Sequence, residues 1–176
     1  TIPVQTGNSL QKMIRDVQVS GQGWRKKHWK TLVQNYSRAP YFREYEDSLA
    51  PLYLHNRAKW LSRLNDEFIQ AAKRLLGIKT QLRFSHEFDL PRDRNERLVE
   101  LCRMHGAKTY ISGPAAEGYL DCDLFARSGI EVGWFDYSGY PEYRQFHPPF
   151  VHRVSVVDLL FHTGPQAAQY LQPGAV

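Results

Sequence analysis

The sequence lacks most of the features that identify an enzyme directly. Its 176 residues contain no Walker loop, no G-x-G-x-x-G, no G-x-S-x-G and no H-E-x-x-H. Its two cysteines, Cys102 and Cys122, form neither a C-x-x-C pair nor a disulfide framework. These absences argue against P-loop nucleotide hydrolases, α/β-hydrolases, zincin peptidases and small disulfide-rich domains. Cys102 falls on the apolar stripe of a predicted helix, which favours a reduced core residue.

Long apolar runs and a recognisable signal peptide are also missing. The composition is that of a globular protein, with 42% hydrophobic residues and a mean hydropathy of −0.53. The length suits one domain, so we predict a single domain over residues 1–176. The low number of cysteines is consistent with a cytoplasmic protein, and we therefore expect a cytoplasmic location. The first residues, Thr1-Ile2-Pro3-Val4, resemble the end of a strand, and we expect the domain to be N-terminally incomplete.

The chain is basic, with a net charge of +5. Such a charge suits an anionic ligand, nucleic acid or an ordinary basic surface; we expect a small anionic ligand or activated sugar, and no nucleic acid. Five basic side chains occupy residues 25–30, the first turns of a helix predicted over residues 24–37. The N-terminus of a helix carries partial positive charge, so basic side chains there are unfavourable. An anion bound by Lys27 and His28 would offset this repulsion. A solvated basic face is the alternative.

Predicted strands alternate with predicted helices along the chain. Strand patterns occur at residues 1–4, 14–19, 82–85, 109–112 and 130–137. Helical patterns occur at residues 24–37, 41–54, 56–76, 94–105, 119–128 and 155–162. Asp93 to Glu96 is a capping-box pattern. This alternation predicts an α/β fold with a mostly parallel sheet and helices on both faces.

The first candidate site is the loop that follows the strand predicted at residues 109–112. Ser112 and Gly113 stand at the strand end, and Tyr119 opens the next helix. Open α/β sheets bind ligands at such strand ends, where backbone amides and hydroxyls can hold a phosphate or carboxylate. A tight turn that needs Gly113 and Pro114 for geometry alone is the alternative.

The second candidate site lies on the helix predicted at residues 155–162. Ser155, Asp158 and His162 share one helical face, which therefore carries a hydroxyl, a carboxylate and an imidazole. A catalytic triad or a pair of metal ligands would use these groups. A capping box formed by Ser155 and Asp158 explains two of them without chemistry. His147 and His152 lack metal-site spacing, and we predict no metal.

The third candidate site is an aromatic and polar stretch at residues 136–147. Tyr137, Tyr143 and Gln145 could stack on and hydrogen-bond to a sugar or nucleobase. An aromatic cluster that seals an edge of the core is the alternative.

These motifs, in their order and spacing, resemble the WbqC-like family of bacterial proteins. The resemblance is carried by Lys27-His28-Trp29, Tyr36, Ala39-Pro40-Tyr41-Phe42, Leu75-Leu76-Gly77-Ile78, Glu96-Arg97-Leu98, Tyr110-Ile111-Ser112-Gly113, Tyr119-Leu120, Phe125, Gly129-Ile130, Pro141-x-Tyr143-x-Gln145 and Ser155-x-x-Asp158-x-Leu160-Phe161-x-x-Gly164. The chain departs from the expected pattern at two positions, with Tyr140 in place of His and His162 in place of Asn. It also lacks an N-terminal segment with a Gln-Pro-x-x-x-Pro strand-loop.

The resemblance implies a bacterial transferase that acts in surface-polysaccharide biosynthesis, such as that of O-antigen. It further implies a Rossmann-like three-layer architecture that lacks an N-terminal strand. In this interpretation the strand-end loop binds a nucleotide-activated or acyl donor, the third site orients the acceptor, and Asp158 or His162 is the general base. The alternative is a non-catalytic ligand-binding or partner-binding protein. A homo-oligomer is a further expectation, and no cofactor is specified.

Overall fold

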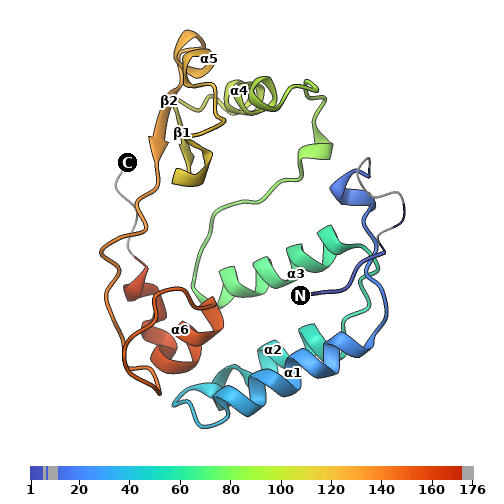
Figure 1. Ribbon diagram of the computed structural model, residues 1–176, viewed down its shortest axis with the longest axis vertical. Helices are drawn as coiled ribbons and strands as arrows, with labels where there is room; N and C mark the ends of the chain where they lie inside the picture. The colour runs from blue at the N-terminus through green and yellow to red at the C-terminus, as the bar shows by residue number, and fades with distance from the viewer. Residues whose placement is uncertain (6, 8–11, 172–176) are drawn as a thin grey trace. The chain divides into compact units, whose positions relative to one another are not determined.

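The computed structural model describes residues 1–5, 7 and 12–171, and the chain divides into two compact units. Unit 1 comprises Thr1–Lys79 and Pro141–Leu171, and unit 2 comprises Thr80–Tyr140 (Figure 1). A single domain stays a prediction, and each unit is described by itself.

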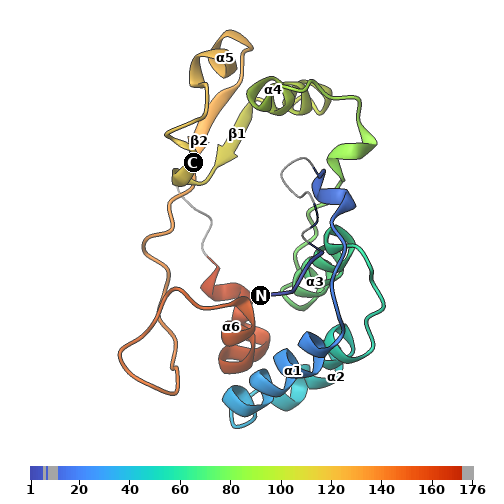
Figure 2. The ribbon, with the colours of Figure 1, turned by 45° about the vertical axis from the view of Figure 1, so that its right-hand side comes forward.

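Unit 1 is helical in its described part. Its helices are α1 (Gly23–Tyr36), α2 (Phe42–Leu54), α3 (Leu61–Leu75) and α6 (Val156–Thr163). Two 3-10 segments, η2 (Ile14–Asp16) and η5 (Gly164–Tyr170), adjoin them. All four helices were predicted from the sequence, and α2 continues through Pro51. In Figures 1 and 2, α1 and α2 lie side by side, and α2 also contacts α6.

The core of unit 1 lies between α1, α2 and α6. Phe42, Leu160 and Phe161 are at most 1% exposed. The Phe42 and Phe161 ring centroids are 5.0 Å apart, and the Tyr41 amide donates to the Phe161 carbonyl at 3.0 Å. The remaining buried members are Trp29, Ala39, Tyr45, Leu49, Leu159 and Ala167. This packing holds α6, which carries the second candidate site, against the start of α2.

Gly164, which ends α6, sits where no other residue fits. Its backbone has φ 58° and ψ −135°, a region essentially restricted to glycine. A Cβ atom there would lie 2.4 Å from the Tyr41 ring. The chain therefore needs glycine both for its backbone conformation and for the close approach of Tyr41.

Replacing Gly164 by alanine is expected to lower the free energy of unfolding by about 3 kcal/mol, because backbone strain and a steric clash add. Urea unfolding measures the change. Gly77→Ala is the matched control, since Gly77 also has a positive φ (68°) but its Cβ would meet nothing within 4 Å. The control should lose only about 1 kcal/mol. Equal losses in the two variants would contradict the role assigned to Tyr41.

Unit 2 combines helices with a parallel strand pair. Its elements are η3 (Ser85–Glu87), α4 (Arg94–Met104), β1 (Thr109–Ser112), η4 (Pro114–Ala116), α5 (Cys122–Arg127) and β2 (Glu131–Trp134). β1 and β2 lie side by side (Figure 2) and are parallel. Thr109 lies opposite Glu131, and Ser112 lies opposite Trp134. A parallel pair needs a crossover, which here includes α5.

Unit 2 confirms the N-cap half of the capping box predicted at Asp93 to Glu96, and the burial of Cys102. The Asp93 side chain accepts from the Asn95 and Glu96 amides, at 2.8 and 3.0 Å, and so caps α4. Cys102 is buried and free. It packs with four other buried side chains: Val99, Leu120, Phe125 and Ile130.

Three predicted strands, at residues 1–4, 14–19 and 82–85, are wrong, and residues 1–4 form only the isolated bridge of Val4. Residues 14–19 form η2 followed by isolated bridges, Val4 with Val19 and Gln18 with Trp60. Residues 82–84 are irregular and lead into η3. Ile14 is 77% exposed, so its side chain is not buried as the alternation implies. The structure is thus of mixed helix and strand class, and the sheet in its described part has two strands. A larger sheet in a three-layer, Rossmann-like arrangement stays a prediction.

No helix in the described ranges is both long and apolar enough to cross a membrane.

Candidate functional site

The Asp158 carboxylate on α6 is the meeting point of three parts of unit 1. It is 5% exposed and accepts three side-chain hydrogen bonds. The Tyr36 hydroxyl, at the end of α1, donates to Oδ2 at 2.9 Å. The Tyr143 hydroxyl and the Gln145 amide donate to Oδ1 at 2.6 and 3.1 Å. An ionised carboxylate accepts and does not donate, so this arrangement suits it.

The predicted capping box at the start of α6 is wrong. Ser155 does occupy the N-cap position, but its side chain makes no capping hydrogen bond. The Asp158 amide instead donates to the Ser155 carbonyl at 2.9 Å. The Asp158 side chain is used by the two tyrosines, and the adjoining Leu159, Leu160 and Phe161 anchor α6 in the core.

Gln145 ties an irregular segment, residues 141–155, to this carboxylate. Its amide nitrogen donates to the Val151 carbonyl at 3.1 Å as well as to Asp158, and its amide oxygen accepts from the Val151 amide at 2.9 Å. The Gln145 side chain therefore fixes the position of the segment over α6. A ligand contact by Gln145 stays a prediction.

His162 lies one turn beyond Asp158 and is almost fully buried. Its Nδ1 atom is 2.8 Å from the Asp158 backbone carbonyl and 3.5 Å from Oδ1. Because a carbonyl oxygen only accepts, Nδ1 carries the hydrogen, and Nε2 of the neutral ring is then an acceptor. Nε2 is buried and has no hydrogen-bond partner in the part of the chain that the structure describes. Buried polar atoms are nearly always paired, so an unpaired basic nitrogen points to a function.

A cavity of about 300 Å³ adjoins Asp158 and His162. Its volume is at the small end of the range for small-molecule sites. The Phe146 ring forms one wall, with its centroid 4.8 Å from that of His162. The other lining residues are Asn35, Tyr36, Gln145, His147, Val151 and Val154.

The two tyrosines are held in their protonated form. Burial, with the hydrogen bond to Asp158 as the next cause, raises the pKa of Tyr36 to about 12. The same causes raise the pKa of Tyr143 strongly. Both hydroxyls therefore remain donors to Asp158 across the physiological pH range.

The raised pKa of Tyr36 predicts an alkaline loss of stability. Between pH 10 and 12 the folded state keeps a proton that the unfolded state loses, so the free energy of unfolding falls by about 2 kcal/mol across this window. Tyr36→Phe should remove that part of the pH dependence. Urea unfolding from pH 8 to 11.5 measures it, with Tyr137→Phe as the control because Tyr137 is 65% exposed. An unchanged slope in Tyr36→Phe would contradict the prediction.

Ser112, Gly113 and Tyr137 come together at one end of the strand pair in unit 2. The Ser112 carbonyl accepts from the Phe135 amide at 2.7 Å. A Cβ atom on Gly113 would lie 3.4 Å from the Tyr137 hydroxyl, so the absent side chain permits this approach. Tyr119 is 55% exposed, and the Arg94 guanidinium lies over its ring at 5.1 Å. Ligand binding by these residues stays a prediction.

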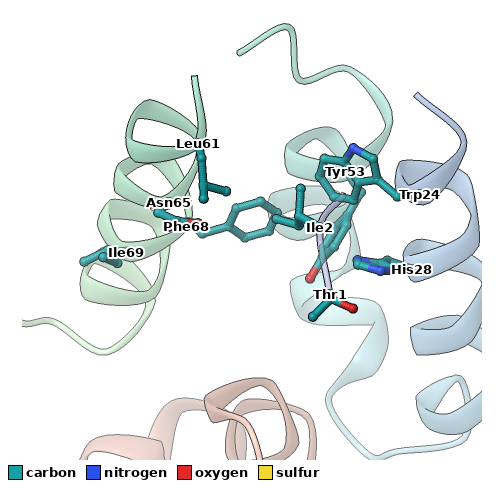
Figure 3. Close-up of a pocket in the computed structure, with 9 residues that line it drawn as sticks. All are labelled: Thr1, Ile2, Trp24, His28, Tyr53, Leu61, Asn65, Phe68 and Ile69. Carbon is teal, nitrogen blue, oxygen red and sulfur yellow. The ribbon is translucent and has the colours of Figure 1, made fainter. Parts of the chain in front are cut away.

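Lys27 and His28 occupy the start of α1, whose first turn contains no acidic residue. Lys27 is exposed. His28 lines a groove of about 620 Å³ between α1, α2 and α3 (Figure 3). Burial lowers the pKa of His28. Figure 3 shows Phe68 of α3 pointing toward Ile2 and Tyr53, so the groove is mostly apolar. Anion binding by Lys27 and His28 stays a prediction.

Sequence reasoning missed Tyr36 and Phe146 as parts of the Asp158 site. Tyr36 continues the apolar stripe of α1, and periodicity assigned it to the core. Its hydroxyl was the available signal, because a buried tyrosine hydroxyl needs a polar partner.

Within the described ranges, no cluster of three or more His, Cys, Asp or Glu side chains could hold a metal ion.

Comparison with known proteins places the chain in a family. The chain is 41% identical over 172 residues to "Uncharacterized protein Rv1507c" of Mycobacterium tuberculosis, an alignment that covers 98% of this chain and 74% of the relative. No solved structure matches the chain. The model of the WbqC-like protein family matches residues 1–170. The chain therefore belongs to the WbqC-like protein family.

Proposed function

We propose that the chain is a bacterial transferase of surface-polysaccharide biosynthesis, and that the cavity beside Asp158 and His162 receives the acceptor. The observation that carries the proposal is the buried, unpaired Nε2 of His162. The His162 residue lines a cavity, and the other nitrogen of its ring is fixed by the Asp158 carbonyl. A basic nitrogen held in this way suits a general base.

The proposed reaction begins with the acceptor in the cavity. Its nucleophilic nitrogen or oxygen attacks the electrophilic carbon of the donor, and a proton of the nucleophile passes to His162 Nε2. The bond from that carbon to the leaving group breaks, and the leaving group departs with the electron pair. The imidazolium that forms lies beside Asp158, with Nδ1 3.5 Å from Oδ1, and the carboxylate stabilises it.

The donor in this proposal is anionic, either nucleotide-activated or an acyl carrier ester. Ser112, Gly113 and Tyr119 would bind it at the end of β1, as strand ends do in a Rossmann-like three-layer fold. The Arg94 guanidinium beside Tyr119 supports this assignment by adding a positive charge.

Ligand-dependent melting tests the proposed function. Nucleotide sugars, acyl thioesters and acidic glycans are added separately to the protein. We expect one class of small donor to raise the Tm and the polymers to leave it unchanged, and Tyr119→Ala should weaken the shift. Stabilisation by acidic glycans alone, with no small donor active, would overturn the proposal.

That outcome would favour a non-catalytic binding protein instead. The observation behind this alternative is the start of α1, where Lys26, Lys27 and Lys30 are exposed and the first turn lacks an acidic residue. A partner with an acidic surface would fit this basic face. Its binding would weaken steeply as the salt concentration rises.

A further inference from the structure

The hydrogen-bonding groups around the Asp158 cavity show which kind of acceptor it can hold. The Tyr36 hydroxyl donates to Asp158, and both amide hydrogens of Gln145 are directed to Asp158 and the Val151 carbonyl. Among residues 1–5, 7 and 12–171, Asp158 Oδ2 accepts a hydrogen bond only from Tyr36, and His162 Nε2 accepts none. The free capacity of these inner groups is therefore for accepting hydrogen bonds, which suits a ligand that donates them.

The charge of the cavity points in the same direction. Asp158 is its sole acidic lining residue, and none of the described lining residues is lysine or arginine. The Asp158 carboxylate is buried with hydroxyl and amide donors but without a basic side chain other than His162. A buried charge is costly without a countercharge, so a cationic ligand group would be stabilised here. A phosphate would instead meet a like charge.

The walls limit the size and character of the rest of the ligand. Phe146, Val151 and Val154 supply apolar surface and are themselves partly open to solvent, as are the polar Asn35 and His147. The cavity of about 300 Å³ suits a ligand of about one sugar ring. An aromatic face such as that of Phe146 suits the C–H face of a sugar.

We infer that the acceptor enters this cavity with a primary amine, carried by a neutral hydroxyl-bearing molecule such as an amino sugar. This inference rests on the proposed function and specifies its acceptor. The ammonium group donates to Asp158 Oδ2 and His162 Nε2. Release of one ammonium proton to water leaves the neutral amine, which is the nucleophile, and Nε2 takes the next proton as the amine attacks the donor carbon. The anionic group of the donor is excluded from the cavity.

Binding of matched sugars tests the inference. Glucosamine, galactosamine and mannosamine are each titrated by ligand-observed NMR at pH 7 against the parent hexose and the N-acetyl derivative. We expect at least one hexosamine to bind about tenfold more tightly than its two partners, the ratio that one favourable ion pair of moderate strength gives. Asp158→Asn should abolish this preference. Glu142→Gln is the control, since Glu142 is an exposed carboxylate of the same segment, and it should retain the preference.

Three results would overturn the inference: equal binding of amine, hydroxyl and N-acetyl forms, absence of binding by every hexosamine, or displacement of a bound hexosamine by inorganic phosphate in competition. The wild-type comparison decides the matter even where Asp158→Asn does not fold. If a donor raises the Tm in the melting test but the hexosamines show no preference, this inference fails and the proposed function is retained. If the donor has no effect either, both fail.

Discussion

Replacing Asp158 by alanine is expected to lower the free energy of unfolding by about 3 kcal/mol and to abolish acceptor binding. The substitution leaves the Tyr36 and Tyr143 hydroxyls and the Gln145 amide without their shared acceptor. Unpaired buried donors cost about 1–3 kcal/mol each, and water that enters the vacated space offsets part of this loss. Urea unfolding measures the stability, and hexosamine titration measures the binding. Asp47→Ala, at an exposed position of α2, is the control and should change neither.

A mutant cycle distinguishes the shared acceptor from a general packing role for Asp158. If the tyrosine hydroxyls cause the loss, Asp158→Ala should be less harmful when Tyr36→Phe and Tyr143→Phe are already present. The interaction free energy should then exceed about 1 kcal/mol, because residues in one hydrogen-bond network are not additive. Simple addition of the losses would show that Asp158 does not organise the two tyrosines.

The local part of this site follows from the sequence. Asp158 and His162 are four residues apart on a predicted helix, and that spacing places them on one face. Tyr143 and Gln145 are two apart in the aromatic and polar stretch at residues 136–147, which was predicted as a candidate site. Both pairs meet at Asp158 in the structure.

The long-range part does not follow from the sequence. Tyr36 reaches Asp158 from 122 residues away because α1 and α6 both pack against α2. No local pattern encodes that packing. The hydrogen bond between Tyr36 and Asp158 depends on core contacts such as that between the Phe42 and Phe161 rings. Periodicity predicts that these rings are buried, but it does not predict which rings contact each other.

The sheet illustrates the same limit. The strand pattern at residues 109–112 was correct, the one predicted at residues 130–137 was correct for 131–134, and an intervening helical pattern correctly predicted that the strands are parallel. The alternation at residues 14–19 was equally clear, yet its residues form a 3-10 turn and single bridges. A strand needs a neighbour of matching length, and a local pattern does not reveal whether one is available.

His162 offers a substitution that separates its two ring nitrogens. Asparagine places an amide N–H close to the position of Nδ1, and the WbqC-like pattern predicts asparagine at this position. His162→Asn should therefore keep the hydrogen bond to the Asp158 carbonyl and lose less than about 1 kcal/mol of stability. It removes Nε2, the unpaired nitrogen. If Nε2 is the general base, the transfer rate should fall about 10²- to 10⁴-fold.

Glutamine at the same position gives the complementary variant, because its amide reaches the position of Nε2 but leaves the Asp158 carbonyl without a donor. His162→Gln should lose stability as well as the transfer rate, since an amide does not take up a proton at neutral pH. Mass spectrometry of the modified acceptor measures the rate, and urea unfolding measures the stability. Full activity in a folded His162→Asn protein would rule out Nε2 as the base. Asp158 would then be the remaining candidate, and its hydrogen bonds from Tyr36 and Tyr143 would have to weaken as it takes the proton.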